Sequence, residues 1–274
     1  MTRAPAAAKI NLALVVGKRR DDGLHEVATV LQRVDVCDRI EVEEADRLRV
    51  EGFGEDTLVA AGLEALAEAA GRESGWRVRI TKQIPVAAGL GGASADAAAA
   101  LVLANGTLPE PLSAERLAEL AARLGADVPF FIAPGPKLAE GAGELLTPLE
   151  LPQDFWVVVA LPRGAAKAST REVYERFDEL GGGHRFAERK QELLDALAAC
   201  RRPRDFAAFP LNDLGAAAER PPLVEDLLEL GAFRADVSGA GPAVYGLFHH
   251  RSAADEAARR CRSRARTWIA APVW

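Results

Sequence analysis

The residues best suited to chemistry lie in a glycine-rich stretch from Pro85 to Leu101. Gly89, Gly91 and Gly92 carry no side chain that would keep an anion away from the backbone. The alanine-rich segment after them predicts a helix over about 94–105, whose unpaired N–H groups and partial positive charge would point into the loop. The pattern favours a phosphate site. A strand-to-helix turn that needs glycine only for its dihedral angles would give the same residues, so both interpretations stay open.

The stretch departs from the common phosphate-binding motifs. No Gly-Lys-Ser or Gly-Lys-Thr follows the glycines, so it is not a P-loop, and Ser94 stands where the dinucleotide fingerprint needs its third glycine. The signatures of protein kinases are also absent from the sequence. What remains is a glycine loop, a serine that could cap the helix, and a helix of small residues able to pack closely.

Two charged residues occur in apolar surroundings. Lys9 lies inside a segment that alternates like a strand, and Asp127 lies between Ala126 and the run Val128-Pro129-Phe130-Phe131. A charged group in such a place needs partners or water if it is buried. A lysine whose stem packs on apolar surface and an aspartate that caps a helix are alternative interpretations, which the residues alone leave open.

The composition excludes several classes of protein. The chain has 274 residues, 49% hydrophobic and 27% charged, which is typical of a globular protein. It contains no run of 18 apolar residues and no signal-type block, so we expect a cytoplasmic protein without a membrane partner. The net charge of −6 argues against non-specific nucleic-acid binding, which needs cationic surface. Three separated cysteines and four histidines predict neither disulfides nor an all-protein transition-metal site.

Hydrophobic periodicity predicts the elements that must position these residues. Residues 10–16 alternate as a strand, and strands over 39–43 and 48–51 flank a polar turn, which predicts an antiparallel N-terminal sheet. A helix begins after Asp56, its expected N-cap, and ends at Gly71. Further strands are expected over 76–80, 155–161, 234–238 and 243–248, and further helices over 113–124, 170–179, 187–199 and 223–230.

Three segments together resemble the motifs of the GHMP small-molecule kinases, which include galactokinase, homoserine kinase and mevalonate kinase. Residues 5–12 resemble the first motif, 85–101 the second and 237–244 the third, a glycine hairpin. Any one of them would be a weak signal, but three in the right order across the chain are specific. The resemblance implies an α+β, two-domain GHMP kinase fold. It implies an N-terminal ribosomal protein S5 domain 2-like domain over 1–152, a C-terminal α/β-sandwich domain over 153–274, and an active site in the interdomain cleft.

Further segments narrow the resemblance to the 4-diphosphocytidyl-2-C-methyl-D-erythritol kinases. These segments are residues 17–25, 31–32, 35–40, 124–131, 140–144 and 212–214. Such enzymes use ATP to phosphorylate the 2-hydroxyl of a cytidine diphosphate polyol in the non-mevalonate pathway of isoprenoid biosynthesis. The resemblance implies ATP and Mg²⁺, the small-molecule substrate CDP-methylerythritol, and a monomer or homodimer. A homoserine or mevalonate kinase of the same superfamily and a catalytically silent nucleotide-binding regulator remain as alternatives.

The resemblance also implies roles for individual residues. Asp127 would orient the acceptor hydroxyl and take its proton, while Lys9 would offset charge on the carboxylate and the phosphate. His25 would read the edge of the cytosine ring and Tyr174 would stack on it, although a surface-loop histidine and a core tyrosine are the plain alternatives. Asn11 and Asp127 would hold the methylerythritol end. The nucleotide would be bound by Pro85, Ala88, Gly89, Leu90, Gly91, Gly92, Ala93, Ser94 and Ala95, with Ser94 a candidate Mg²⁺ ligand, and the substrate also by Gly239, Ala240 and Gly241.

The sequence departs from the family pattern at several positions. Leu24 stands where the family usually has tyrosine, so the cytosine ring would lose one aromatic wall and we expect weaker cytidine affinity. Ala93 and Ala95 replace a usual glycine and serine in the loop. Thr57 replaces an asparagine associated with the adenine pocket, and Ala240 replaces a serine in the hairpin. Because these changes leave backbone groups in place, ATP binding would depend mostly on the backbone.

Overall fold

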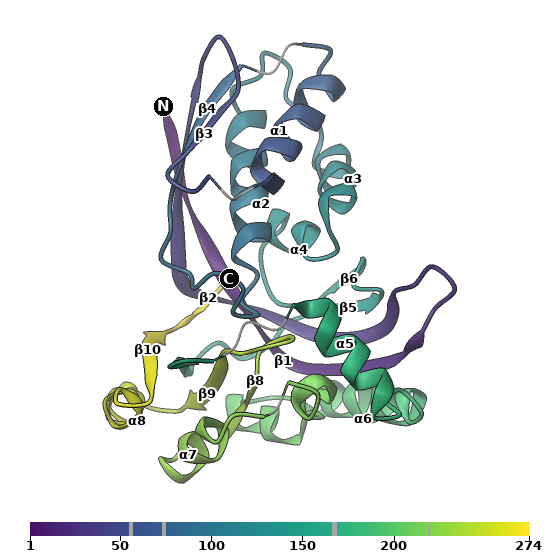
Figure 1. Cartoon of the computed structure of the whole chain (residues 1–274), viewed down its shortest axis with the longest axis vertical. Helices are drawn as coiled ribbons and strands as arrows, with labels where there is room; N and C mark the ends of the chain where they lie inside the picture. The colour runs from purple at the N-terminus through teal and green to yellow at the C-terminus, as the bar shows by residue number, and fades with distance from the viewer. Residues whose placement is uncertain (55–56, 73–74, 166–168, 219) are drawn as a thin grey trace. The chain divides into compact units, whose positions relative to one another are not determined.

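The computed structural model describes residues 1–54, 57–72, 75–165, 169–218 and 220–274 (Figure 1). Contacts within the chain divide it into two compact units. The first unit comprises residues 1–8, 36–86 and 91–134, and the second comprises 9–35, 87–90 and 135–274. The predicted boundary between residues 152 and 153 concerns sequence-contiguous domains and stays a prediction. The expected cap Asp56 lies outside the described residues.

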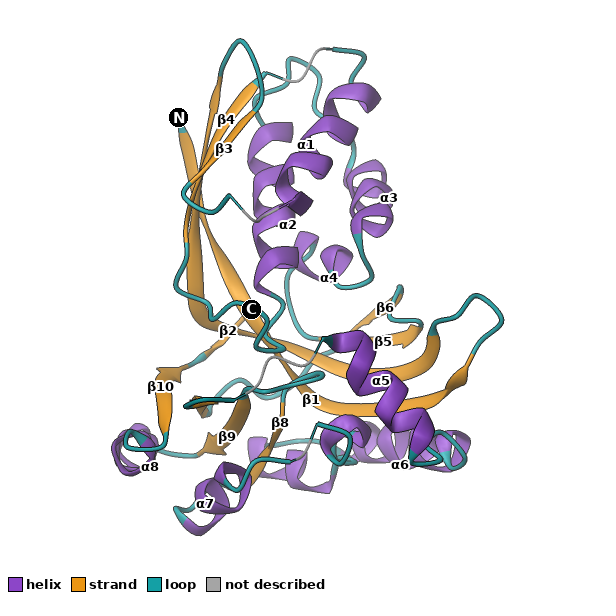
Figure 2. Cartoon of the chain, viewed as in Figure 1, coloured by secondary structure: helices purple, strands orange, loops and turns teal. Residues whose placement is uncertain are grey.

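Both units use parts of the two longest strands, β1 (Thr2–Arg19) and β2 (His25–Glu44) (Figure 2). In the first unit, β2 pairs antiparallel with β4 (Trp76–Thr81), which pairs parallel with β3 (Arg49–Glu51). The prediction of a purely antiparallel N-terminal sheet is therefore wrong at β3. The helix between β3 and β4 in the sequence supplies the crossover connection that a parallel pair needs.

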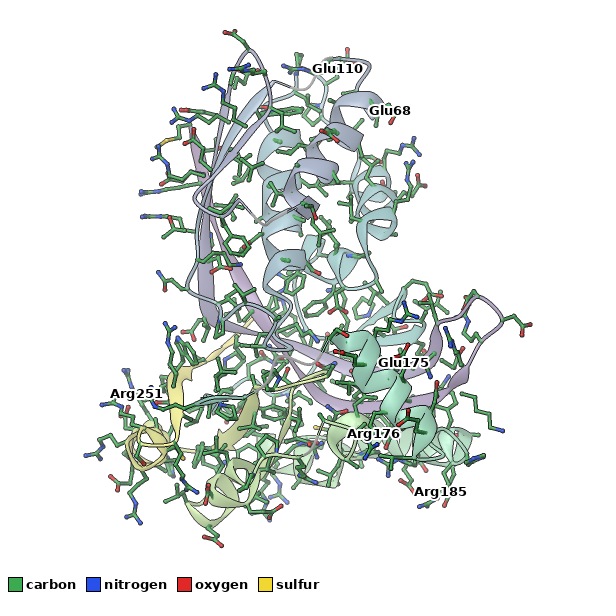
Figure 3. The ribbon with its side chains drawn as sticks, viewed as in Figure 1. Glu68, Glu110, Glu175, Arg176, Arg185 and Arg251 are labelled. Carbon is green, nitrogen blue, oxygen red and sulfur yellow. The ribbon has the colours of Figure 1, made fainter. Side chains whose placement is uncertain are left out.

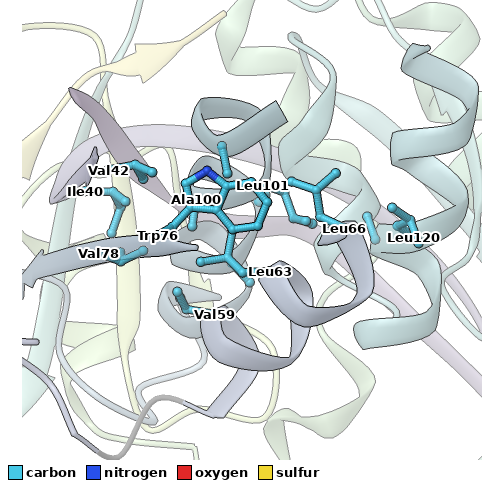
Figure 4. Packing of buried hydrophobic residues seen from close by; sticks show 14 of the residues in the cluster. Ile40, Val42, Val59, Leu63, Leu66, Trp76, Val78, Ala100, Leu101 and Leu120 are labelled. Atoms are coloured by element: carbon cyan, nitrogen blue, oxygen red, sulfur yellow. The ribbon is translucent and has the colours of Figure 1, made fainter. Parts of the chain in front are cut away.

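Four helices complete the first unit: α1 (Thr57–Ala69), α2 (Gly92–Asn105), α3 (Ala114–Leu124) and α4 (Val128–Ile132). Figure 4 shows their shared core with β2 and β4, in which Leu63, Leu101 and the fully buried Trp76 pack together. The alanines of α2 allow close packing along its length. Trp76 satisfies its only polar group by donating its indole N–H to the Thr107 hydroxyl at 2.9 Å. The apolar face of the sheet thereby fixes the position of α2, which follows the glycine loop.

The second unit contains two groups of strands. Residues 27–31 of β2 pair antiparallel with β5 (Lys137–Gly141), which pairs with β6 (Leu145–Pro148), and residues 33–34 of β2 pair with β11 (Pro272–Val273). A separate antiparallel sheet has the order β10-β7-β9-β8. Its strands are β7 (Trp156–Pro162), β8 (Arg234–Val237), β9 (Val244–Phe248) and β10 (Ala265–Ala270).

Among the described residues, four helices and two 3-10 turns connect these strands along the sequence. They are α5 (Thr170–Glu179), α6 (Phe186–Ala199), α7 (Leu223–Glu229) and α8 (Arg251–Cys261), with 3-10 turns η1 (Pro203–Ala208) and η2 (Asp213–Gly215). The predicted helices over 170–179, 187–199 and 223–230 are confirmed. The sequence did not predict α4, β5, β6, β10 and β11. In the part of the chain that the structure describes, no helix combines the length and hydropathy needed to cross a membrane.

Candidate active site

Strand β1 places Lys9 and Asn11 on one face, because side chains two residues apart in a strand point the same way. The Lys9 ammonium donates to Asn11 Oδ1 at 2.7 Å, and Asn11 Nδ2 donates to the Thr29 hydroxyl of β2 at 2.8 Å. Thr29 in turn donates to the Ala13 carbonyl at 2.7 Å. Lys9 and Asn11 are 5% and 3% exposed. The predicted amine is thus a buried, hydrogen-bonded cation, and the interpretation of Lys9 as a snorkelling edge lysine is wrong.

The backbone of the glycine loop meets this strand and the hairpin near the C-terminus. The Lys9 N–H donates to the Leu90 carbonyl at 2.9 Å, and the Ser238 hydroxyl donates to the Gly89 carbonyl at 3.0 Å. The Ala243 N–H donates to the Ala88 carbonyl at 3.1 Å. Three segments that lie far apart in the sequence, and that carry the three predicted motifs, therefore meet within the second unit.

Two glycines make this approach feasible. Gly89 has φ +80°, and a Cβ built there would lie 2.1 Å from the Ser238 carbonyl oxygen. Gly239 has φ +56°, and its Cβ would lie 3.3 Å from the Gly89 carbonyl oxygen, 3.4 Å from Lys9 Nζ and 3.5 Å from Asn11 Oδ1. A side chain at either position would displace the neighbouring backbone or crowd the amine. Glycine is required here by close approach and by dihedral angle together.

Ala87, just before these glycines, has φ +50°, which only glycine adopts readily. Among the residues that the structure describes, Ala87 is the one residue other than glycine whose φ is positive. Such strain persists where the surrounding structure imposes it, and it is concentrated at functional sites. Its place in the loop supports a binding role for residues 87–90. Ala240 and Gly241 continue the hairpin: Ala240 is half-buried against the same cluster as Tyr174, and Gly241 has φ +73°.

A second group of predicted residues forms around His25, at the start of β2. Its Nε2 lies 2.8 Å from Asp178 Oδ1, and its ring lies 4.7 Å from the Tyr174 ring between centroids, tilted by 38°. The Phe177 ring lies edge-on to the His25 ring, with 6.3 Å between the two ring centroids. Tyr174, Phe177 and Asp178 occupy positions i, i+3 and i+4 of α5 and so share one helix face. His25 is therefore held on the helix, with its side chain 7% exposed, and it is not a surface-loop residue.

The start of α2 differs from the prediction. The N-cap is Gly91, at φ +69°, without a side-chain cap, and Ser94 lies in the first turn. The prediction of Ser94 as the capping residue is wrong, because the helix begins two residues earlier than its small-residue pattern suggested. The first turn contains no acidic residue. Pro85, Gly92 and Ser94 are half-buried, whereas Ala93 is exposed and Ala95 is buried.

A buried ion cluster lies behind this turn. Lys82 donates to Asp38 Oδ2 at 2.5 Å and to Asp96 Oδ2 at 2.7 Å, and both carboxylates have 0% side-chain exposure. Asp38 also accepts from the Gln83 and Ile84 N–H groups. Burial raises the pKa of Asp96 to about 7, despite the Lys82 hydrogen bond, and the nearby Asp38 charge adds to the rise. The cluster joins β2, the end of β4 and the first turns of α2.

Asp127 belongs to the first unit, where it immediately precedes α4 and is half-buried. It occupies the N-cap position in a helical conformation, but its side chain makes no cap hydrogen bond to α4. The alternative interpretation of Asp127 as a helix cap is therefore wrong. The structure groups Lys9, Asn11, Ala88, Gly89, Leu90 and Gly239 in the second unit, whereas Pro85, Gly91 to Ala95 and Asp127 belong to the first.

Metal ligands stay unassigned. Within residues 1–54, 57–72, 75–165, 169–218 and 220–274, no group of three or more His, Cys, Asp or Glu side chains could hold a metal ion. Sequence reasoning also missed Asp178 and the Lys82, Asp38 and Asp96 cluster. The four-residue spacing between Tyr174 and Asp178 was the one available signal for the first of these.

Comparisons with known proteins agree with this arrangement. Residues 57–135 match the GHMP kinases N terminal domain and residues 221–267 match the GHMP kinases C terminal domain. The 4-diphosphocytidyl-2-C-methyl-D-erythritol kinase of Citrifermentans bemidjiense is 38% identical over 281 residues, covering 98% of this chain and 96% of the relative.

Solved structures show the same fold. A crystal structure of 4-(cytidine 5'-diphospho)-2C-methyl-D-erythritol kinase superposes with a TM-score of 0.82 at 33% identity, covering 100% of both chains. The Methanococcus jannaschii mevalonate kinase has a TM-score of 0.75 at 13% identity, covering 99% of this chain and 98% of that one, which shows the shared fold alone. With relatives this similar along almost its whole length, the chain belongs to the 4-diphosphocytidyl-2-C-methyl-D-erythritol kinase family of the GHMP kinases.

Proposed function

We propose that this chain transfers the γ-phosphoryl group of ATP to the 2-hydroxyl of 4-diphosphocytidyl-2-C-methyl-D-erythritol, in the non-mevalonate pathway of isoprenoid biosynthesis. The observation that carries the proposal is the meeting of the three motifs: Lys9 and Asn11 on β1, Gly89 in the loop and Gly239 in the hairpin. Phosphoryl transfer needs chiefly alignment and charge neutralisation, which a buried amine beside a glycine backbone supplies.

Lys9 and Asp127 carry the chemistry in this proposal. Asp127 orients the acceptor hydroxyl and accepts its proton, and Lys9 stabilises negative charge on the carboxylate and on the transferred phosphoryl group. Asn11 holds Lys9 in place through the 2.7 Å hydrogen bond and offers polar atoms to the polyol. Burial strengthens the electrostatic effect of Lys9, because fewer water molecules screen its charge.

The start of α2 suits the nucleotide phosphates. The first-turn N–H groups of Gly92, Ala93 and Ser94 precede the first intrahelical hydrogen bond, which Ala95 donates to Gly91, and the N-cap Gly91 has no side chain to cap them. Backbone N–H groups at a helix N-terminus bind anions. Mg²⁺, held mainly by the phosphates and with Ser94 as the candidate protein ligand, would neutralise charge on the ATP. Cytoplasmic location and a monomer or homodimer remain part of the proposal.

His25 recognises the cytosine ring in this proposal, with Tyr174 packed beside it. A carboxylate only accepts hydrogen bonds, so the Asp178 contact places a proton on His25 Nε2. In the neutral imidazole, Nδ1 is then an acceptor that suits the 4-amino group of cytosine. Leu24, 55% exposed, stands where the family usually has an aromatic residue, so we expect a weaker hold on the base than in relatives with tyrosine there.

A substrate panel tests the proposal. Purified chain is incubated with MgATP and, in parallel, the cytidyl polyol, mevalonate or homoserine, while ADP release is followed by a coupled assay. We expect turnover of the cytidyl polyol alone. In the Asp127→Asn variant, we expect kcat to fall roughly 10²- to 10⁴-fold. Turnover of mevalonate or homoserine only would refute the substrate assignment. Absence of turnover on all three would favour a silent nucleotide-binding protein.

A further inference from the structure

Residues 212–214 match the family pattern, yet nothing described so far gives them a role. Asn212 is 6% exposed and immediately precedes the turn η2 in the second unit. Its neighbour Asp213 ties the turn to β1, because Asp213 Oδ2 accepts the Val16 N–H at 2.9 Å. The turn is therefore anchored to the strand that carries Lys9 and Asn11. A side chain from this anchored turn can set the position of whatever it binds.

Asn212 uses both polar atoms of its side chain and its backbone N–H. Its Nδ2 donates to the Val237 carbonyl at 3.0 Å and to the Gly239 carbonyl at 2.7 Å. Its Oδ1 accepts the Leu214 N–H at 2.9 Å, and its own N–H donates to Asp236 Oδ2 at 2.8 Å. An asparagine amide has two donor hydrogens, and both are committed to the hairpin backbone. The hairpin carbonyls at 237 and 239 are thus fixed by one side chain.

The hairpin that Asn212 binds lies against the proposed catalytic groups. The position of a Cβ on Gly239 is 3.4 Å from Lys9 Nζ, 3.5 Å from Asn11 Oδ1 and 3.3 Å from the Gly89 carbonyl oxygen. Next to it, the Ser238 hydroxyl binds the same Gly89 carbonyl at 3.0 Å. Gly239 has no side chain of its own to hold it there. Its distance from Lys9 is consequently set by its backbone bonds, and Asn212 makes the 2.7 Å bond to its carbonyl.

We propose that Asn212 is a positioning residue that holds the hairpin backbone at Gly239 against Lys9, Asn11 and Gly89, so that the amine and the phosphate loop keep their productive geometry. The inference rests on the proposed function. Catalysis is sensitive to such geometry, because a misplacement of about 1 Å costs on the order of 10²-fold in rate. Asn212 itself touches no reacting group and acts only through the hairpin.

The chain provides a matched control in Asn105, at the end of α2 in the first unit. Asn105 is 8% exposed, and its side chain binds Leu112 with Nδ2 donating to the carbonyl at 3.0 Å and Oδ1 accepting the N–H at 2.8 Å. Asn105→Ala and Asn212→Ala therefore each remove a buried side-chain amide that both donates to and accepts from the backbone. Both variants lose unfolding free energy, whereas only Asn212→Ala should alter the reaction. The pair separates a loss of stability from a loss of positioning.

The test compares these two variants and the milder Asn212→Ser with the parent chain. All activities are measured at a temperature at which urea denaturation curves show each protein to be folded in the absence of urea. We expect kcat on the cytidyl polyol to fall at least about tenfold in Asn212→Ala and less in Asn212→Ser, with KM for the polyol within about twofold. Asn105→Ala should keep the parental kcat. An unchanged kcat in both Asn212 variants, or an equal fall in Asn105→Ala, would overturn the inference.

Amide hydrogen exchange provides a readout that needs no substrate. The Ser238 N–H donates to the Ala243 carbonyl and the Gly241 N–H to the Ser238 carbonyl, so both amides report on hairpin order. We expect both to exchange faster in the Asn212 variants than in Asn105→Ala. Unchanged exchange would refute the positioning role whatever the kinetics. If the parent chain failed to phosphorylate the polyol while the hairpin still loosened, the proposed function would fail and the hold of Asn212 on the hairpin would stand.

Discussion

At the scale of single residues, base recognition depends on how Asp178 orients His25. The 2.8 Å contact favours a proton on Nε2, because a carboxylate only accepts hydrogen bonds, and in that tautomer Nδ1 is the acceptor. Cytosine offers a 4-amino donor at the matching position, whereas uracil offers an oxygen that also accepts. A site built around one hydrogen-bond pattern discriminates strongly against a ligand that leaves its polar group unpaired. The Asp178 carboxylate should therefore act on selectivity more than on turnover.

Asp178→Ala should lower the preference for the cytidine diphosphate substrate over its uridine analogue by about tenfold, because the imidazole can then carry its proton on either nitrogen. The measurement is the ratio of kcat/KM for the two substrates. Glu179→Ala, one residue along α5, is the control, since Glu179 forms an exposed ion pair with Arg176, the arginine labelled in Figure 3. A ratio that is unchanged in Asp178→Ala, or lowered equally in Glu179→Ala, would contradict the role of Asp178.

The residues that sequence reasoning found differ in kind from those it missed. Lys9, His25 and Tyr174 lie in local motifs whose residue types are informative by themselves. Asp178 is informative only beside His25, which lies 153 positions away in the sequence. An aspartate on an amphipathic helix otherwise resembles any solvated charge. The catalytic roles of Lys9 and Asp127 stay predictions.

At the scale of elements, the position of α2 depends on the backbone conformation at its start and on the buried ion cluster of Lys82, Asp38 and Asp96. The alanine-rich pattern predicted α2 to within two residues, but its start depends on the left-handed conformation of Gly91, which residue types do not specify. The parallel pairing of β3 with β4 was missed for a related reason. A three-residue strand carries no pattern that determines its partner or its register.

The ion cluster behind α2 makes stability depend on pH. Because the pKa of Asp96 is raised to about 7 in the folded chain and is near 3.9 in an unfolded one, the folded state binds this proton more tightly. Its contribution to the unfolding free energy is complete below the unfolded pKa and is lost as pH rises through about 7. The loss of unfolding free energy between pH 5 and pH 7 is about 2 kcal/mol.

Asp96→Asn removes this titrating group while keeping an oxygen that can accept from Lys82. We expect its unfolding free energy, measured by urea denaturation from pH 5 to pH 8, to vary less with pH than that of the parent chain. The matched variant Asp46→Asn changes an exposed aspartate of the same unit and should keep the parental slope. Equal slopes in all three proteins would show that Asp96 does not hold a proton near neutrality.

At the scale of the whole molecule, the order of the three motifs along the sequence predicted the family, but not how the chain is shared between its compact units. That sharing depends on contacts between distant segments. In the second unit, Leu14, Val16 and Val27 of the N-terminal strands form a buried cluster with Val173 and Phe177 of α5, together with Leu214 and Ala217. Periodicity marks each residue as buried without identifying its partner.

The same cluster predicts the behaviour of a fragment cut at the sequence-predicted boundary. Residues 1–152 retain the described segments of the first unit, but they lose α5 and the other later partners of Leu14, Val16 and Val27. Exposing three such side chains costs roughly 5 to 9 kcal/mol, at about 1.5–3 kcal/mol each. Amides of β4 and α2 should therefore keep slow hydrogen exchange, while those of residues 9–19 exchange rapidly. Adding fragment 153–274 should restore their protection. If residues 9–19 were as protected in the isolated fragment as in the full chain, the boundary at 152 would separate two independently folding domains.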